Sequence, residues 1–389
     1  MYLFNPDNDL ALANFSANYT SPVSAQKIAE DLSVLPFWYV PAGSKIVVEG
    51  DENKAFLTSM QSLFGIETTM ISFSEICNFP TEKIVPWGWN PALRKKLLEA
   101  KVPEENLPTI NSLKQLRDYS GRQYAVKMLR ELKKENDFFC GESHYFTSVD
   151  DVLRFLASQS GNSVLKMPNS GSGKGLIWIL GEITDKQTDW VRRVIKMQNG
   201  IVAEPVLNKV RDFAMEFYMD NGNIRFVGYS LFHSTASGAY MGNVLMSDER
   251  IEEQLSEYVS LNILHQLCVS LQEKLLRFFP FYNGYLGVDM MICQIPAGGY
   301  HIQPCVEINM RMNMGLVAHM FYKRFLAQGA SGRYMVDYFK KTGEALAFHQ
   351  KMQTDFPLII ENRRIEKGYL ALTPVNESSN YMAWVIIDN

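Results

Sequence analysis

The sequence predicts a small parallel α/β unit followed by a larger α+β region. Over the first 110 residues, short apolar runs of strand type alternate with helical patterns, which is typical of a parallel sheet. Farther on, residues 163–207 read as strand, loop, strand, helix and strand, and residues 284–310 read as two paired strands. A chain of 389 residues also has room for two or three domains with separate cores.

The N-terminal α/β unit is expected to span residues 1–112. Its strands are expected at 2–4, 45–50, 68–73 and 83–88, and its helices at 24–35 and 91–101. Prolines and glycines between residues 86 and 108 interrupt these patterns, so they separate this unit from the next one.

Three further domains are expected after the first, at residues 113–200, 201–330 and 331–389. In the first of them, helical patterns at 113–134 and 148–159 precede the strands. In the second, a hairpin turns at "DNGN" and is followed by a helical region at 248–278. The last combines one helix with late strand-like runs.

Charge and hydropathy exclude several classes of partner. A net charge of -4 and a pI near 5.9 create no general field that attracts nucleic acid or an anionic membrane. The start of the chain does not look like a signal peptide, and no run reaches the roughly 18 apolar residues of a membrane span. We therefore expect a cytoplasmic protein without nucleic-acid or membrane partners, and the sequence leaves a homodimer open.

The cysteines and histidines give no metal or disulfide pattern. The five cysteines are odd in number and form no C-x-x-C pair, and the six histidines are scattered. Structural thiols are therefore expected, and neither a zinc site nor a disulfide framework.

The stretch "SVLKMPNSGSGKGLIWIL" places Lys166 on an apolar run before a glycine-rich loop. It is not a P-loop, because Pro168 occupies the position of the first glycine and Gly175 the position of the hydroxyl residue. It is not a dinucleotide fingerprint either, because Leu176 stands where the last glycine should be.

The two paired strands carry an oxygen-rich cluster. Residues two apart on a strand face the same way, so Glu307 and Asn309 share a face that Asp289 on the neighbouring strand can join. Such a set suits Mg²⁺ that also binds phosphate oxygens. Arg311 follows on the same face and can form a forked contact with a phosphoryl group. The alternative is that these acids are solvated ends of strands.

Taken in order, these motifs resemble those of the ATP-grasp superfamily over roughly residues 113–325. The shared order is a lysine strand, a glycine loop, "AEPVL", the acid-bearing strand "GVD", and "VEINMR". Each motif is weak alone, and the order makes the match. The resemblance implies an ATP held between two α+β lobes, the lid lobe 113–200 and the metal-bearing lobe 201–330, behind a small parallel α/β domain.

The resemblance also implies residue roles. Lys166 resembles the lysine that contacts the ATP phosphates, and Glu204 begins a hinge that reads adenine through the backbone of Pro205 and Leu207. Asp212 resembles a ribose or lid contact. The expected lid over the phosphates contains Ser170, Gly171, Ser172, Gly173 and Lys174. Lys174 can equally be a solvated loop lysine.

Further roles concern the phosphate end of the nucleotide. Arg122 stands where the family usually has a second nucleotide-binding lysine, and Arg311 resembles the arginine on the transferred phosphoryl group. The resemblance implies that Asp289, Glu307 and Asn309 hold Mg²⁺, with two ions as the usual number.

The implied reaction is ATP-dependent activation of a small-molecule carboxylate as an acyl phosphate, which an amine or thiol then attacks. The expected catalytic residues are Lys166 and Arg311, with His233, Tyr240 and Arg225 as substrate candidates in and near "SLFHSTASGAYMGNVL". An ordinary connecting segment is the alternative for that stretch. Two other functions stay open: phosphorylation of a hydroxyl by a kinase of the same fold, and a non-catalytic ATP-binding regulatory role.

Overall fold

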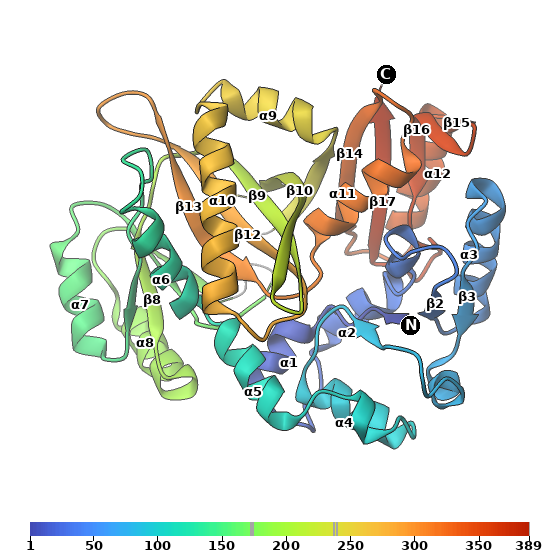
Figure 1. Cartoon of the computed structure of the whole chain (residues 1–389), viewed down its shortest axis with the longest axis horizontal. Coiled ribbons are helices and arrows are strands. Elements are labelled where there is room, and N and C mark those ends of the chain that lie inside the picture. Colours follow the sequence, from blue (N-terminus) through green and yellow to red (C-terminus); the bar gives the residue numbers. More distant parts are fainter. Residues whose placement is uncertain (172–174, 236–237, 239, 389) are drawn as a thin grey trace. The chain divides into compact units, whose positions relative to one another are not determined.

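The computed structural model describes residues 1–171, 175–235, 238 and 240–388 (Figure 1). These residues form two compact units. The first unit consists of Met1–Leu113, Met241–Ser247 and Arg311–Asn389, and the second of Lys114–Tyr240 and Asp248–Met310. No helix in the described part of the chain is both long and apolar enough to cross a membrane.

The first unit begins with a parallel sheet of four strands in the order β3-β2-β1-β4. Its strands are β1 (Tyr2–Leu3), β2 (Lys45–Val47), β3 (Thr69–Ile71) and β4 (Val85–Pro86). The helices between and after them are α1 (Asn8–Asn14), α2 (Val23–Asp31), α3 (Asp51–Phe64), α4 (Pro91–Glu99) and α5 (Ile110–Tyr119), with short 3-10 turns at Leu35–Trp38, Phe73–Asn78 and Glu104–Asn106. The small parallel α/β domain expected from the sequence is therefore confirmed.

Local signals explain where these helices begin and end. Asn90 caps α4, since its side chain accepts a hydrogen bond from Leu93 N at 2.9 Å, and Pro91 supplies the first helical residue. The α1 and α3 helices were not expected from the sequence. The first of them lies in a polar stretch that reads as a turn.

The first unit also contains five antiparallel strands in the order β11-β14-β17-β16-β15. Their bounds are β11 (Tyr240–Leu245), β14 (Ser331–Tyr338), β15 (Ile359–Glu361), β16 (Arg364–Ala371) and β17 (Tyr381–Asp388), and the helices beside them are α11 (Met314–Phe325) and α12 (Glu344–Asp355).

A shared aromatic core joins the two ends of the chain within this unit. Trp38 is fully buried, and its ring lies 5.8 Å from Phe64, 5.5 Å from Phe321 and 5.1 Å from Phe325, centroid to centroid. Its Nε1 donates to the Leu372 carbonyl at 2.6 Å. The C-terminal segment therefore completes the core of the first unit.

The second unit contains a small antiparallel sheet in the order β5-β8-β6-β7. It is built from β5 (His144–Phe146), β6 (Ser163–Lys166), β7 (Leu176–Ile179) and β8 (Ile201–Pro205), with α7 (Val149–Ser158) and α8 (Asp185–Gln198). Apolar residues of both helices pack on Leu165, Ile179 and Ile201 of the sheet. One face of this sheet is thus covered, and its other face carries the charged residues described below.

The larger sheet of the second unit has the order β13-β12-β9-β10, all antiparallel. Its strands are β9 (Lys209–Asp220), β10 (Asn223–Ser234), β12 (Gly284–Gln294) and β13 (Tyr300–Asn309), with the helices α6 (Arg122–Leu132), α9 (Asp248–Ser256) and α10 (Leu261–Phe278). Asn221 and Gly222, both with positive φ, make the two-residue turn from β9 to β10 that the "DNGN" signal predicts.

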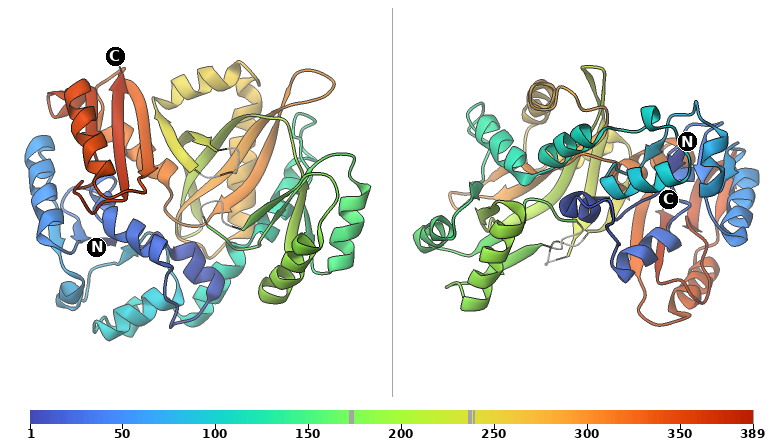
Figure 2. Two further views of the ribbon diagram at one scale, coloured as in Figure 1. Left: turned by 180° about the vertical axis from the view of Figure 1, so that it is seen from behind. Right: turned by 90° about the horizontal axis from the view of Figure 1, so that it is seen from below.

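Helices cover only one face of this larger sheet. Figure 1 shows α10 in front of β9 and β12, and the view from behind in Figure 2 shows the strands in front of the helix. The buried side chains Phe213, Met215 and Phe217 alternate along β9. Because neighbours on a strand point to opposite faces, Ala214 and Glu216 belong to the uncovered face.

Candidate functional site

The Lys166 side chain lies in a buried ion pair with Glu204. On the antiparallel strands β6 and β8, Glu204 pairs with Val164 and Lys166 pairs with Val202, so both charged side chains share one face. Lys166 Nζ lies 2.6 Å from Glu204 Oε2, and Ser143 Oγ donates to Glu204 Oε1 at 2.8 Å. The face of the small sheet opposite α7 and α8 therefore presents a fixed lysine.

The three expected metal ligands share one face of the larger sheet. Asp289 on β12 pairs directly with Glu307 on β13, and Gly287 pairs with Asn309. Directly paired residues point to the same side, so the side chains of Asp289, Glu307 and Asn309 lie together. Asn309 Nδ2 donates to Asp289 Oδ2 at 3.0 Å.

Arg122 connects the lid strand to the metal-ligand strand. It opens α6 and is buried. Its Nη1 donates to the Met167 carbonyl at 2.5 Å and to Ser170 Oγ at 2.8 Å, while Nη2 lies 2.7 Å from Glu307 Oε1. Its backbone N–H also donates to the Pro168 carbonyl at 3.0 Å. One guanidinium thus fixes the base of the glycine loop and pairs with an expected metal ligand.

The electrostatics of Cys305 place these groups around one point. Burial raises the pKa of the Cys305 thiol well above its usual value, and the carboxylates of Asp289, Glu204 and Glu307 raise it further. The Lys166 ammonium acts on the same thiol in the opposite direction. The lysine face of the small sheet and the acidic face of the larger sheet therefore come within electrostatic reach of a single side chain.

The described residues of the glycine loop are held at its base. Asn169 N–H donates to Gln198 Oε1 at 2.8 Å, and Ser170 is held by Arg122 as described above. Gly175 has a φ of +103°, and a Cβ there would lie 2.7 Å from Ser170 Cβ, so only glycine fits this return of the chain. Gly171 is described, whereas Ser172, Gly173 and Lys174 lie outside the described residues.

The expected adenine hinge follows directly from the Lys166 pair. Pro205 ends β8, and Leu207 lies in the short connection to β9. Asp212 stands on β9, where its Oδ2 accepts from Lys209 Nζ at 2.6 Å and from Ser234 Oγ at 2.5 Å.

Arg311 lies in the first unit, where it forms a forked ion pair with Asp9. Its Nε and Nη2 lie 2.7 and 2.6 Å from the two Asp9 carboxylate oxygens. Asp9 is in the first turn of α1. The sequence gave no sign of this pair, because its partners are 302 positions apart.

The substrate candidates are dispersed. His233 is exposed on β10 and, because Phe232 pairs with Asp212, points to the opposite face from it. Arg225 is exposed on the same strand, 5.1 Å from the Tyr218 ring centroid. Tyr240 begins β11. These three residues therefore do not form one cluster with Asp289.

The donor set of the larger sheet fits magnesium. Two carboxylates and an amide on one face are hard oxygen ligands, which Mg²⁺ combines with phosphate oxygens. Elsewhere in the described residues, no group of three or more His, Cys, Asp or Glu side chains is gathered in a way that could hold a metal ion.

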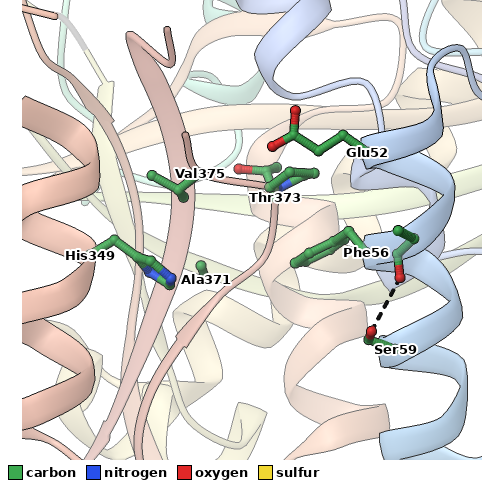
Figure 3. A pocket seen from close by; sticks show the side chains of 9 residues that line it. Glu52, Phe56, Ser59, His349, Ala371, Thr373 and Val375 are labelled. Carbon is green, nitrogen blue, oxygen red and sulfur yellow. Dashed lines mark hydrogen bonds between the residues drawn. The ribbon is translucent and has the colours of Figure 1, made fainter. Parts of the chain in front are cut away.

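A cavity of about 350 Å³ lies apart from these residues, in the first unit (Figure 3). Glu52 and Phe56 of α3 face His349 of α12 across it, with Thr373 beside them. Burial lowers the pKa of His349, and no Lys or Arg is among the described residues that line the cavity. The cavity therefore lacks a cation that could hold phosphate and does not suit a nucleotide.

Comparison with known proteins identifies the fold. No family model matches the sequence, and no curated protein matches it. Biotin carboxylase from Campylobacter jejuni, solved with a β,γ-ATP ligand, superposes with a TM-score of 0.52 at 10% identity, over 90% of this chain and 88% of that chain. The chain has the ATP-grasp fold.

Two other solved structures superpose less well on this ATP-grasp chain. N5-carboxyaminoimidazole synthetase from Staphylococcus aureus gives a TM-score of 0.47 at 12% identity, over 90% of this chain and 94% of that one. L-amino acid ligase from Bacillus licheniformis gives 0.44 at 12% identity, over 89% and 93%. The ATP-grasp fold expected from the motif order is thus confirmed.

Some residues of the site have no motif that could identify them in advance. Ser143 on the loop before β5 holds Glu204, and Cys305 lies between the charged faces. Cys305 falls within the strand that carries Glu307, so its position near the acids could be read from the sequence. Ser143 could not, because its contact spans 61 positions.

Proposed function

We propose that the protein is an ATP-dependent ligase that activates a carboxylate as an acyl phosphate and transfers it to an amine or thiol. The observation that carries the proposal is the meeting of Lys166 and Glu204 with Asp289 and Glu307 around Cys305. The ATP-grasp fold supports it, as does a biotin carboxylase neighbour solved with an ATP ligand.

The residues divide the proposed work between binding and charge neutralisation. Lys166 and Arg122 supply positive charge to the triphosphate, and the glycine loop closes over it. Magnesium, held by Asp289, Glu307 and Asn309, would neutralise charge on the phosphoryl group. Most of the catalysis then comes from alignment and electrostatic stabilisation.

The proposed reaction has two balanced steps. A carboxylate oxygen of the substrate bonds to the γ-phosphorus as the bond to ADP breaks, which gives an acyl phosphate. The nucleophile then bonds to the acyl carbon as the bond to phosphate breaks. We assign Arg311 to the transferred phosphoryl group, which requires it to leave Asp9.

The test is an ADP-release assay with Mg-ATP, pooled carboxylic acids and hydroxylamine, which traps an acyl phosphate as a hydroxamate. We expect ADP and hydroxamate from the wild type, and loss of both in Asp289→Asn and Glu307→Gln. Glu257→Gln, which changes an exposed acid outside the site, is the matched control and should retain activity.

Two results would contradict the proposal. If ADP forms together with a stable phosphoester and no hydroxamate, the enzyme is a kinase. If the two acid variants keep full turnover, the magnesium assignment is wrong.

A further inference from the structure

A fourth acid shares the face of the expected metal ligands. Glu216 of β9 pairs directly with Gly287 of β12, which pairs on its other side with Asn309 of β13. Paired residues point to the same side, so the Glu216 side chain lies on the face of Asp289 and Glu307. It is only 1% exposed. None of the roles assigned above uses this carboxylate.

Glycines flank Glu216 on both neighbouring strands. Gly228 of β10 pairs with it on one side, and Gly287 of β12 on the other. Neither glycine carries a side chain, so the sheet itself leaves room beside the carboxylate in this row. The next row outward is bulky, since the rings of Tyr218 and Tyr285 lie 4.7 Å apart, centroid to centroid. The row of Glu216 is therefore a recess between the metal row and an aromatic row.

The recess is one step from the expected phosphoryl site. Ala214, two residues before Glu216, pairs with Asp289, which pairs with Glu307. Two residues of strand span about 6.8 Å, so a group beside Glu216 lies next to the metal row without replacing a ligand in it. This is the separation at which a second substrate can approach an acyl phosphate.

Charge selects what can enter the recess. The cations around the site are paired with other acids: Lys166 with Glu204, Arg122 with Glu307 and Lys209 with Asp212. A buried carboxylate favours a cationic ligand and disfavours an anionic one. It would therefore attract an ammonium group and repel both a thiolate and the carboxylate substrate.

We propose that Glu216 binds the amino group of the nucleophile, so that the co-substrate is an amine and not a thiol. This inference rests on the proposed ligase function and makes it more specific. The amine nitrogen bonds to the acyl carbon while the bond to phosphate breaks. Of the two protons that the ammonium form loses, one leaves with the phosphate and one passes to solvent.

The experiment separates the two half-reactions in the full-length protein. Acyl phosphate formation is followed as hydroxamate with Mg-ATP, pooled acids and concentrated hydroxylamine, which is small and uncharged at neutral pH. Transfer is followed by mass spectrometry with ethanolamine, alanine and lysine as amine probes, and mercaptoethanol and coenzyme A as thiol probes.

We expect amide products, and no thioester, from the wild type. In Glu216→Gln, hydroxamate formation should stay within about twofold, while the KM for the amine rises about 10- to 100-fold, the size of a lost charge-assisted hydrogen bond. Glu216→Asp keeps the charge and should recover part of the affinity. Glu257→Gln is again the exposed control.

Other outcomes overturn the inference in distinguishable ways. Hydroxamate with thioester but no amide would keep the ligase function and reject Glu216 as an amine site. Equal loss of both half-reactions in Glu216→Gln and Glu216→Asp, with a lowered melting temperature, would show a structural role. No hydroxamate from the wild type would reject the ligase function and the inference with it.

Discussion

At the scale of single residues, the most constrained feature is the Lys166–Glu204 pair. Both side chains are less than 10% exposed, and Ser143 satisfies the second carboxylate oxygen. Burying two charges costs desolvation energy that the mutual attraction offsets only while both partners are present. Such a pair can release its lysine toward an anionic ligand because the ligand replaces the lost carboxylate contact.

This argument predicts the stability of variants at the pair. Lys166→Met leaves Glu204 buried without its cation, so we expect the free energy of unfolding to fall by about 3–5 kcal/mol. The double variant Lys166→Met/Glu204→Gln removes both charges and should recover much of that loss. Urea unfolding of the four proteins measures the cycle. Additive losses would mean that the two residues do not depend on each other.

Cys305 provides a prediction about pH. Its pKa is raised in the folded state, so below about pH 8.5 the thiol is neutral in both the folded and the unfolded chain and contributes no pH dependence. Above that pH the unfolded chain ionises first, and the free energy of unfolding should decrease. Cys305→Ser should show a smaller decrease between pH 8 and 10 in urea unfolding. An identical slope in both proteins would exclude Cys305 as the cause.

At the scale of elements, the twofold period of strands explains how much of the site could be predicted. Glu307 and Asn309 lie two apart, so their shared face follows from the sequence alone, and the hairpin brings Asp289 beside them. The pairing register could not be predicted, because an irregularity separates Asp289 from Met291. Contacts such as Arg122 with Glu307 span 185 positions and depend on how helix and sheet pack.

Arg122 supports an element-scale prediction about the lid. Lysine would keep the charge but cannot make the forked contacts to Met167, Ser170 and Glu307, so Arg122→Lys should loosen the loop base. We expect faster hydrogen–deuterium exchange in residues 166–171 and a loss of about 1–3 kcal/mol in unfolding free energy. Arg192→Lys, at an exposed arginine of α8, is the matched control. Unchanged exchange at the loop would contradict this role.

At the scale of the whole molecule, the fold class was predictable and the assembly of each unit was not. Alternating strand and helix patterns identified the parallel sheet, and the motif order identified the ATP-grasp fold. Nothing local indicated that Trp38 would share a core with Phe321 and Phe325, because that packing joins segments almost 300 residues apart. The C-terminal segment therefore belongs to the core of the first unit, although the sequence indicates only a separate extension.

The Asp9–Arg311 pair yields the prediction that tests this assembly. It ties α1, near the start of the chain, to the residue at which the chain re-enters the first unit after β13. The two side chains are largely buried and the contact is forked, so we expect Asp9→Asn to lower the unfolding free energy by about 1–3 kcal/mol. Four of the six tryptophans, among them Trp38 and Trp384, lie in this unit, so fluorescence reports its unfolding.

The same pair separates a structural role of Arg311 from a catalytic one. If Arg311 leaves Asp9 to bind the transferred phosphoryl group, Asp9→Asn should keep or raise turnover, because it weakens the competing contact. Arg311→Met should abolish turnover while the Mg-ATP thermal shift persists. If both variants lose stability and turnover in parallel, Arg311 acts only by holding α1, and the phosphoryl group must be neutralised by Lys166, Arg122 and magnesium alone.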